Sequence, residues 1–377
     1  MQLPFNALSL FSVGKLFSTF LPESYGSHPT CPISTLPPSY NLTVGKVART
    51  FGLSNPSLYP ECEQLDSYPI ILAFHGRGAS WQHMAKLTNL HDPTYCAITI
   101  YPQGLPGYGL SDGNTCDNDA RRKPSWAGAP YATCYDLDHP DQPRDDFGFF
   151  HALLDYIKDR PELKGDLERV YVTGKSNGAH FTNYLACDPD ASKRIAAIAP
   201  VAGPYYQAKD RWTPGRCRPS KPIAVINFQG TEDRSVEYEG SEEWINCPAN
   251  SSVGDGEERR CVGKIPGIWY WFLGWGERNK CQNEVIERDG GMTEGQRIVI
   301  QSFEQCAGGK EVRHYKVVGG KHVWPARCCN LDNLKRDGSG KCEIAPVDAT
   351  DEIVRFFLRF KVAADEETLL GNERGDL

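Results

Sequence analysis

Residues Arg169-Val-Tyr-Val-Thr-Gly-Lys-Ser-Asn-Gly178 of this 377-residue chain give the clearest indication of its fold. Its first five residues predict a strand, and a helical stretch follows it directly. Gly174 and Gly178 flank a serine, a pattern typical of a sharp turn from strand to helix, because side chains at the two glycines would clash. Such a turn exposes the Ser176 hydroxyl beside the backbone N–H groups of a helix N-terminus. Ser176 is therefore a candidate nucleophile, and an ordinary glycine-rich turn is the alternative.

An alternation of strands and helices extends in both directions from this turn. Continuous apolar runs are typical of strands in a sheet that is covered on both faces. They occur at Tyr68–Phe74, Cys96–Tyr101, Arg169–Thr173, Ile195–Ala202, Ile223–Phe228 and Val312–Val318. Apolar residues at i, i+3 and i+4 predict helices over Asp145–Lys158 and Asp348–Phe360, the second behind an Asp348 N-cap. Residues 40–50 predict a hairpin that pairs antiparallel at the sheet edge. The fold class is therefore α/β, with a mostly parallel sheet.

The alternation predicts one α/β domain over residues 31–362. Residues 1–30 are expected to form an N-terminal segment that is a candidate signal or leader of unorthodox sequence. Residues 363–377 are expected to form a charged, disordered tail. Pro102–Arg144 and Glu239–Lys264 do not fit the alternation. We expect these two stretches to be loop insertions over a cleft, each held by a disulfide.

Composition and charge restrict the class of protein. The net charge is −7 and the 41 basic residues form no patch, so nucleic acid and anionic membranes are poor partners. No apolar run reaches the roughly 18 residues of a membrane span. The 14 cysteines include no CxxC pair, so zinc is not expected and an oxidising compartment is. Glycosylation sequons at Asn41 and Asn250 agree with secretion.

A nucleophilic serine needs a base and a group that orients the base. Asp233 follows the predicted strand 223–228, and His322 follows the predicted strand 312–318. The order serine, aspartate, histidine is that of one family of serine hydrolases. Glu232 is a rival for the acid, and His314 lies inside a predicted strand, which disfavours it as the base. Ser176, Asp233 and His322 are therefore the predicted catalytic residues.

The predicted strand 68–74 ends in His75-Gly-Arg-Gly78, where an oxyanion-binding loop belongs. The backbone N–H groups of Arg77 and Asn177 would cradle a developing oxyanion, since the glycines permit close approach of the backbone. The alternative is an ordinary glycine turn. The charges of Arg77 and Lys175 are more simply explained as solvated cations.

Several motifs together resemble fungal-type feruloyl esterases, in the carbohydrate esterase group that also contains acetylxylan esterases and polyhydroxybutyrate depolymerases. The motifs, between residues 67 and 360, are Phe74–Gly78, Trp126-Ala-Gly-Ala-Pro-Tyr131, Asp145–Phe149, Arg169–Gly178, Gly230–Asp233 and Gly320–Pro325. The resemblance implies an α/β-hydrolase fold, the same three catalytic residues, no cofactor or metal, and secretion. It implies a substrate of ester-linked hydroxycinnamates in plant polysaccharides. Acetylxylan or polyhydroxybutyrate as substrate, or a non-catalytic binding module, are the alternatives.

Some residues depart from the pattern of that group. Lys175 replaces a residue that is usually apolar, and Glu237 replaces a common proline. The insertion with Cys247 and Cys261 is longer than expected. All three border the expected cleft and therefore affect the choice of substrate.

Aromatic residues near the motifs predict a surface on which a hydroxycinnamoyl ring stacks. The substrate-binding residues predicted from them are Trp126, Tyr131 and Trp324.

Adjacent cysteines rarely pair with each other, so one of Cys328 and Cys329 is expected to form a disulfide with Cys342 or with an earlier cysteine. We expect the protein to be a monomer. Its expected binding partner is the ester substrate.

Overall fold

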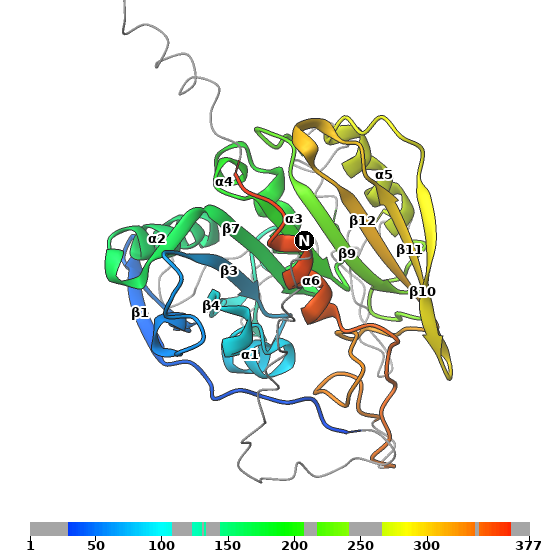
Figure 1. Ribbon diagram of the computed structural model, residues 1–377, viewed down its shortest axis with the longest axis horizontal. Coiled ribbons are helices and arrows are strands. Elements are labelled where there is room, and N and C mark those ends of the chain that lie inside the picture. Colours follow the sequence, from blue (N-terminus) through cyan, green and yellow to red (C-terminus); the bar gives the residue numbers. More distant parts are fainter. Residues whose placement is uncertain are drawn as a thin grey trace, which may run out of the picture.

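A ten-stranded sheet, in the order β1-β2-β4-β3-β7-β8-β9-β12-β11-β10, organises the molecule (Figure 1). The computed structural model describes residues 29–107, 123–129, 132, 144–206, 217–240, 266–335 and 339–362. Neighbouring strands are parallel from β4 to β12. These six are β3 (Tyr68–Phe74), β4 (Ile98–Pro102), β7 (Gly165–Lys175), β8 (Ala197–Val201), β9 (Ala224–Gly230) and β12 (Val312–Val318). They confirm the six apolar runs, with ends that shift by a few residues.

Antiparallel hairpins close both edges of the sheet. The predicted N-terminal hairpin is confirmed as β1 (Ser39–Val44) and β2 (Val47–Leu53), and β2 pairs with β4. The other edge holds β10 (Ile286–Thr293) and β11 (Gln296–Phe303), which sequence reasoning missed. Their mixed polar and apolar residues lack the continuous apolar run of a central strand. A separate two-stranded sheet pairs β5 (Pro106–Gly107) with β6 (Lys123–Pro124).

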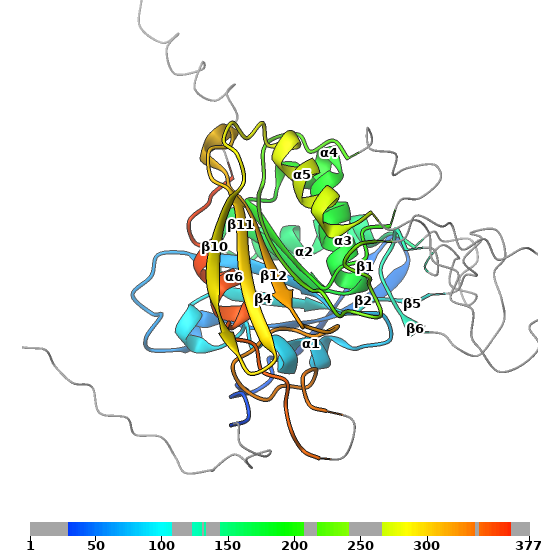
Figure 2. The same ribbon diagram turned by 90° about the vertical axis from the view of Figure 1, so that its right-hand side faces the viewer.

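Helices cover both faces of the sheet, as predicted (Figure 2). Helices α2 (Asp146–Lys158), α3 (Asn177–Cys187) and α5 (Ile268–Arg278) pack on one face, and α1 (Trp81–Thr88) and α6 (Ala349–Phe357) on the other. Ile70 and Leu72 of β3 point into the first core and Ile71 and Ala73 into the second, the alternation of a strand buried on both faces. The short helices are α4 (Pro189–Lys193), η1 (Pro56–Leu58), η2 (Pro93–Tyr95), η4 (Pro161–Leu163) and η5 (Ala307–Gly309).

Aspartate side chains begin the two predicted helices. The side chain of Asp145 accepts from Gly148 N at 2.6 Å, and that of Asp348 accepts from Thr350 N at 3.0 Å. Each bond satisfies a backbone N–H group that has no partner within its helix. The Asp348 N-cap is thereby confirmed. No helix in the ranges described above is long and apolar enough to cross a lipid bilayer.

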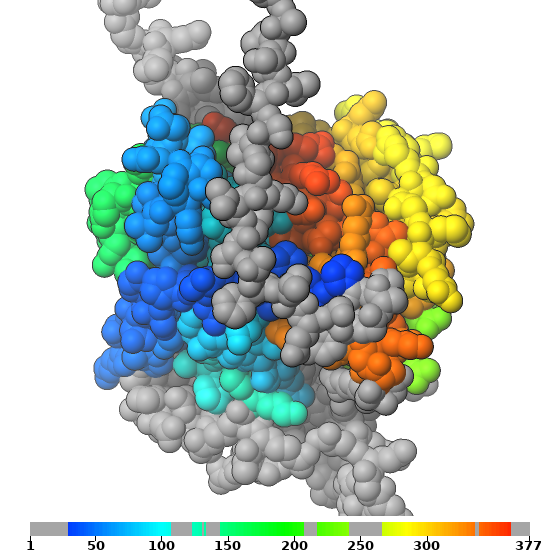
Figure 3. Space-filling view, turned by 60° about the horizontal axis from the view of Figure 1, so that its bottom comes forward, coloured from blue at the N-terminus to red at the C-terminus, as the bar shows by residue number. Residues whose placement is uncertain are grey.

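Disulfides tie distant segments of the chain together. They join Cys31 to Cys328, Cys62 to Cys96, Cys187 to Cys217, Cys281 to Cys306 and Cys329 to Cys342. The expectation for the adjacent cysteines is confirmed, since Cys329 bonds with Cys342 and Cys328 with an earlier cysteine. In Figure 3 the dark-blue beginning of the described chain lies against orange segments from its C-terminal part. The cysteines of the two predicted insertions, Cys116, Cys134, Cys247 and Cys261, lie outside the described residues, as do most of the predicted leader and the tail.

Candidate active site

The turn at Ser176 has the strained geometry that the sequence predicts. Strand β7 ends at Lys175 and α3 begins at Asn177, with Ser176 between them at φ 55° and ψ −118°. A positive φ is unfavourable for a residue with a side chain and occurs often at functional sites. A Cβ atom at Gly174 would collide with the carbonyl oxygen of Gly178, and one at Gly178 with that of Phe74. Both glycines are therefore required for the turn.

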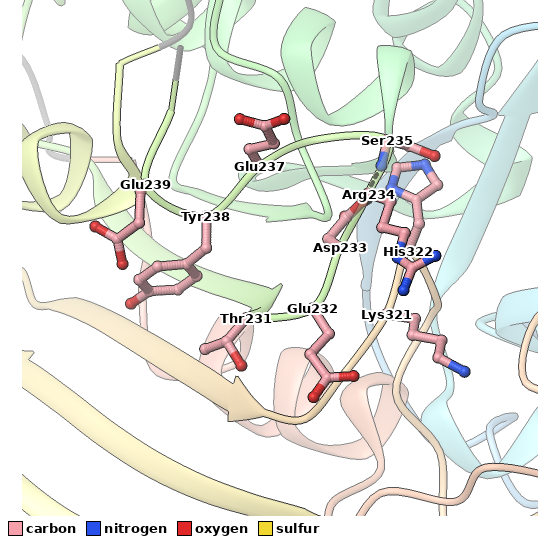
Figure 4. Close-up of a pocket in the computed structure, with 10 residues that line it drawn as sticks. All are labelled: Thr231, Glu232, Asp233, Arg234, Ser235, Glu237, Tyr238, Glu239, Lys321 and His322. Carbon is pink, nitrogen blue, oxygen red and sulfur yellow. Dashed lines mark hydrogen bonds and ion pairs between the residues drawn. The ribbon is translucent and has the colours of Figure 1, made fainter. Parts of the chain in front are cut away.

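Asp233 and His322 form a hydrogen-bonded pair (Figure 4). His322 Nδ1 lies 2.7 Å from Asp233 Oδ2, and the Asp233 side chain is buried. The carboxylate also accepts from Gln229 Nε2 at 3.0 Å and from the backbone N–H groups of Ser235 and Val236 at 2.8 Å each. Because the carboxylate accepts from Nδ1, that nitrogen carries the proton and Nε2 keeps a lone pair. The pair thus has the bonding pattern of a general base and its orienting acid.

Ser176 and His322 line one pocket of about 200 Å³. Its other lining residues are Gly76, Arg77, Ala79, His83, Met84, Leu87 and Lys175. Among the hydrogen bonds of the described residues, none joins Ser176 Oγ to the imidazole. Such bonds are often long before substrate binds, so this geometry is compatible with proton transfer on binding.

His322 also lines a second, larger cavity of about 840 Å³ (Figure 4). The residues that line it carry carboxylates, hydroxyls and basic groups: Thr231, Glu232, Asp233, Arg234, Ser235, Glu237, Tyr238, Glu239 and Lys321. The imidazole therefore lies between a small pocket with the serine and a larger polar cleft.

The loop before α1 brings the Gly76–Arg77 peptide to the serine. A Cβ atom at Gly76 would lie 3.4 Å from Ser176 Cβ. His75 Nε2 accepts from Gly104 N at 2.9 Å, so its proton is on Nδ1, which donates to Gly76 O at 2.8 Å. Burial lowers the pKa of His75 to about 4, so the ring is neutral above that pH. Since a trans peptide points its N–H opposite to its carbonyl, the His75 bond also orients the N–H of Arg77.

Asn177 begins α3 and has a fully buried side chain. Its Oδ1 accepts from Trp126 N at 2.7 Å, and its Nδ2 donates to Trp126 O at 3.3 Å. The side chain thus fixes residue 126 against the helix. The backbone N–H of Asn177 lies at the N-terminus of α3, where the helix dipole favours negative charge.

The two tryptophans predicted to bind substrate are buried. Trp126 is 0% exposed and its Nε1 donates to His75 O at 2.9 Å. Trp324 is 1% exposed and its Nε1 donates to Thr350 Oγ1 at 3.0 Å. The prediction that these rings stack on a substrate is wrong in this structure, because each indole packs in the core with its N–H satisfied there. Tyr131 lies outside the described residues.

The rival candidates for acid and base have other places. Glu232 is exposed, and the imidazole bonds with its neighbour Asp233 instead. His314 is buried in β12, with Nδ1 at 2.7 Å from Asn227 Oδ1 and Nε2 at 2.8 Å from the Tyr238 hydroxyl. Of the two predicted glycosylation sites, Asn41 is exposed on β1 and Asn250 lies outside the described residues.

Sequence reasoning missed three groups that support the site. Gln229 bonds with the acid, and His75 orients the loop at the serine. Lys175 forms an ion pair with Asp332. His75 and Lys175 stand inside recognised motifs and Gln229 directly before one, but a motif indicates a position and not a partner. Only the fold brings the partners together.

Comparison with known proteins found similar chains, although no protein-family model matches. Feruloyl esterase B of Piromyces equi is 30% identical over 158 residues, which are 42% of this chain and 25% of that protein. The match thus spans about a quarter of the curated relative. An acetyl xylan esterase from Aspergillus awamori is 12% identical with a TM-score of 0.40, covering 76% of this chain and 94% of that one. A lipase/esterase from Lactobacillus plantarum is 15% identical with a TM-score of 0.35, covering 54% and 80%. The resemblance to feruloyl esterases that the motifs predict is confirmed by the first of these relatives.

Proposed function

We propose that this protein is a serine carboxylic-ester hydrolase whose nucleophile is Ser176. The observation that carries the proposal is the Asp233–His322 pair, whose imidazole lines a pocket together with a serine in a strained turn. Structural serines rarely need a positive φ, and the strain is explained if the hydroxyl must be presented to a substrate.

The proposed reaction is a two-step acyl transfer. Asp233 holds the imidazole with its proton on Nδ1, and Nε2 takes the proton of the Ser176 hydroxyl as its oxygen attacks the ester carbonyl. The backbone N–H groups of Arg77 and Asn177 bind the oxyanion. The alcohol leaves with the proton from His322, and water, activated by the same imidazole, releases the acid. Loss of one oxyanion donor in such a site typically costs about 10²–10³ in kcat.

The proposed substrate is an ester of ferulic or a related hydroxycinnamic acid on a plant cell-wall polysaccharide. The similarity to feruloyl esterase B supports this choice. The five disulfides among the described residues support a secreted protein, because such bonds persist in oxidising compartments. The cleft of about 840 Å³ beside His322 has the hydroxyl- and carboxylate-rich lining that suits a sugar.

A smaller acyl group, such as acetyl on xylan, is the second candidate. The observation that favours it is the pocket at Ser176, whose described lining includes Met84 and Leu87 but no phenylalanine, tyrosine or tryptophan. With Trp126 and Trp324 buried, the aromatic surface that motivated a hydroxycinnamoyl ring is reduced. The two candidates share one mechanism and differ only in the acyl group.

Kinetics on a panel of purified esters test both candidates. We expect a higher kcat/KM for methyl ferulate, caffeate or p-coumarate than for methyl acetate or methyl 3-hydroxybutyrate, which share the same leaving group. Faster cleavage of the acetyl or hydroxybutyryl ester would transfer the assignment to the corresponding esterase and leave the mechanism intact. Ser176→Ala should fold normally and lose turnover on every ester. A variant that retains turnover would refute the proposed nucleophile.

A further inference from the structure

Lys175, the residue before the candidate nucleophile, forms an ion pair with Asp332. Lys175 Nζ lies 2.9 Å from Asp332 Oδ2, and the side chains are only 13% and 12% exposed. Lysine is an unusual residue for this place, because the end of a buried parallel strand favours apolar side chains. A charge held there at the cost of desolvation needs a partner, and Asp332 supplies it.

The same carboxylate oxygen also contacts the segment that carries the candidate base. Asp332 Oδ2 accepts from the backbone N–H of Trp324 at 3.0 Å, and Trp324 is two residues after His322. One oxygen thus joins the residue before Ser176 to a residue just after His322. The hydrogen bonds of Asp332 therefore run between the two halves of the proposed catalytic apparatus.

The segment that presents Asp332 is itself held in place. Asp332 N donates to Asn330 Oδ1 at 2.9 Å, and Asn330 Nδ2 donates to Trp324 O at 2.9 Å. Just before it, Cys328 and Cys329 are bonded to Cys31 and Cys342. These bonds therefore hold the backbone of Asp332 in place.

The base needs such a support because regular structure does not position it. Residues 319–328 form neither helix nor strand, so β12 ends before His322. A misplacement of about 1 Å between reacting groups can cost about 100-fold in rate. We propose that the Lys175–Asp332 ion pair positions residues 319–328, the His322 segment, against residues 174–178, the nucleophile turn. This inference rests on the proposed function.

A direct role for Lys175 in substrate binding is the competing explanation, since Lys175 also lines the pocket. The charged and titratable groups that line this pocket are Arg77, His83, Lys175 and His322, and Asp332 lies close enough to act on His83. Burial lowers the pKa of His83, while Asp332 raises it and Lys175 lowers it, which places the ion pair beside that ring. Because Asp332 neutralises the ammonium group, the pair adds no net charge that would attract an anionic substrate. Positioning therefore explains the pair better.

The test compares Lys175→Met, Asp332→Asn, the double variant and Lys175→Arg on p-nitrophenyl acetate. We expect each single variant to lower kcat about 10- to 100-fold with KM changed less than about twofold, since positioning acts on the chemical step. The double variant should lose no more than the worse single variant, because the two residues act as one unit. Lys175→Arg should restore most of kcat.

The matched control is Arg169→Met, which breaks an ion pair of similar exposure on the same strand. Arg169 Nε lies 2.7 Å from Asp166 Oδ2, with side chains 23% and 16% exposed, and Arg169 precedes Lys175 by six residues on β7. It should lower Tm without lowering kcat. Additive losses in the double variant, an effect on KM alone, or an equal kcat loss in Arg169→Met would overturn the positioning role. If the unaltered protein cleaves no ester, the proposed function fails as well, whereas an active protein with unaffected variants refutes only this inference.

Discussion

The nucleophile turn and the histidine segment are held in place by different means. Ser176 lies between the last residue of β7 and the first of α3, and Ser176 N donates to Val201 O of β8 at 3.0 Å. The His322 segment, residues 319–328, lies outside helix and strand. Backbone bonds fix its flanks, since Gly320 O accepts from Glu232 N at 2.8 Å and Pro325 O accepts from Ala349 N at 2.9 Å. The Asp233 carboxylate, the Lys175–Asp332 ion pair and, further along, two disulfides add to these bonds.

This difference predicts which substitutions should displace the serine and which should displace the histidine. Backbone hydrogen bonds and close-packed glycines hold the serine, so only a backbone clash should displace it. Around the histidine, side-chain and covalent bonds add to backbone bonds at the flanks, so single side-chain changes should displace it more easily than they displace the serine. Variants in each region therefore test whether this division is correct.

Loss of the acid should give the largest effect on rate. Asp233→Asn should lower kcat by about 10⁴, because an amide favours the wrong tautomer of the imidazole. Steady-state kinetics on p-nitrophenyl acetate measure it. The control is Glu232→Gln, which alters the exposed neighbour and should leave kcat unchanged. An equal loss in the control would mean that Glu232 is the acid.

A methyl group at Gly178 should break the nucleophile turn. Gly178→Ala directs a Cβ atom against the carbonyl oxygen of Phe74, so we expect a loss of several kcal/mol in the free energy of unfolding, or no folded protein. Gly45→Ala is the control, since Gly45 has φ 60° but nothing within 4 Å of an added Cβ. It should cost only about 1 kcal/mol in urea titrations. Similar costs for the two variants would contradict the close-approach argument.

Removal of one disulfide should separate stability from activity. The double variant Cys329→Ser/Cys342→Ser and its control Cys281→Ser/Cys306→Ser should each lose about 2–4 kcal/mol of stability. Only the first pair adjoins the segment with Asp332, so only its variant should also lose about tenfold in kcat. Denaturant titrations and kinetics on the same preparations measure both quantities. Equal kcat in the two variants would show that the disulfides do not support the histidine.

Buried histidines should make the fold acid-sensitive. Burial lowers the pKa of His75 and of His180 to about 4 and that of His314 to about 3, against a reference of about 6.5 for an unfolded chain. The unfolded chain binds more protons between these values, so stability is present above pH 6.5 and is lost as the pH falls toward 4. Each histidine contributes a slope of about 1.4 kcal/mol per pH unit. His314→Gln should reduce the slope between pH 6 and 5 by about that amount. An unchanged slope would contradict the buried, neutral ring.

The sequence predicted the parts of the site that depend on local backbone chemistry. The two glycines around Ser176, the apolar runs and the Asp348 N-cap each act within a few residues, so their patterns are visible in the chain. The Asp233–His322 bond could be anticipated because parallel strands bring their carboxyl ends to one edge.

The missed parts depend on contacts between distant residues. Lys175 and Asp332 are 157 positions apart and no local pattern relates them. The burial of Trp126 and Trp324 could not be predicted either. An aromatic residue near a motif gives the same sequence pattern whether its ring packs in the core or faces a cleft. The edge strands β10 and β11 were missed because their half-exposed residues lack a continuous apolar run.

Covalent labelling with a serine-directed reagent tests whether Ser176 is the nucleophile. The protein, incubated with a fluorophosphonate, should gain one adduct, and peptide mass spectrometry should locate it at Ser176. The rate of labelling should fall at acid pH, because a protonated imidazole accepts no proton from the serine. Ser176→Ala should gain no adduct and have no esterase activity. An adduct on another residue, or full esterase activity in a protein that remains unlabelled, would contradict the account.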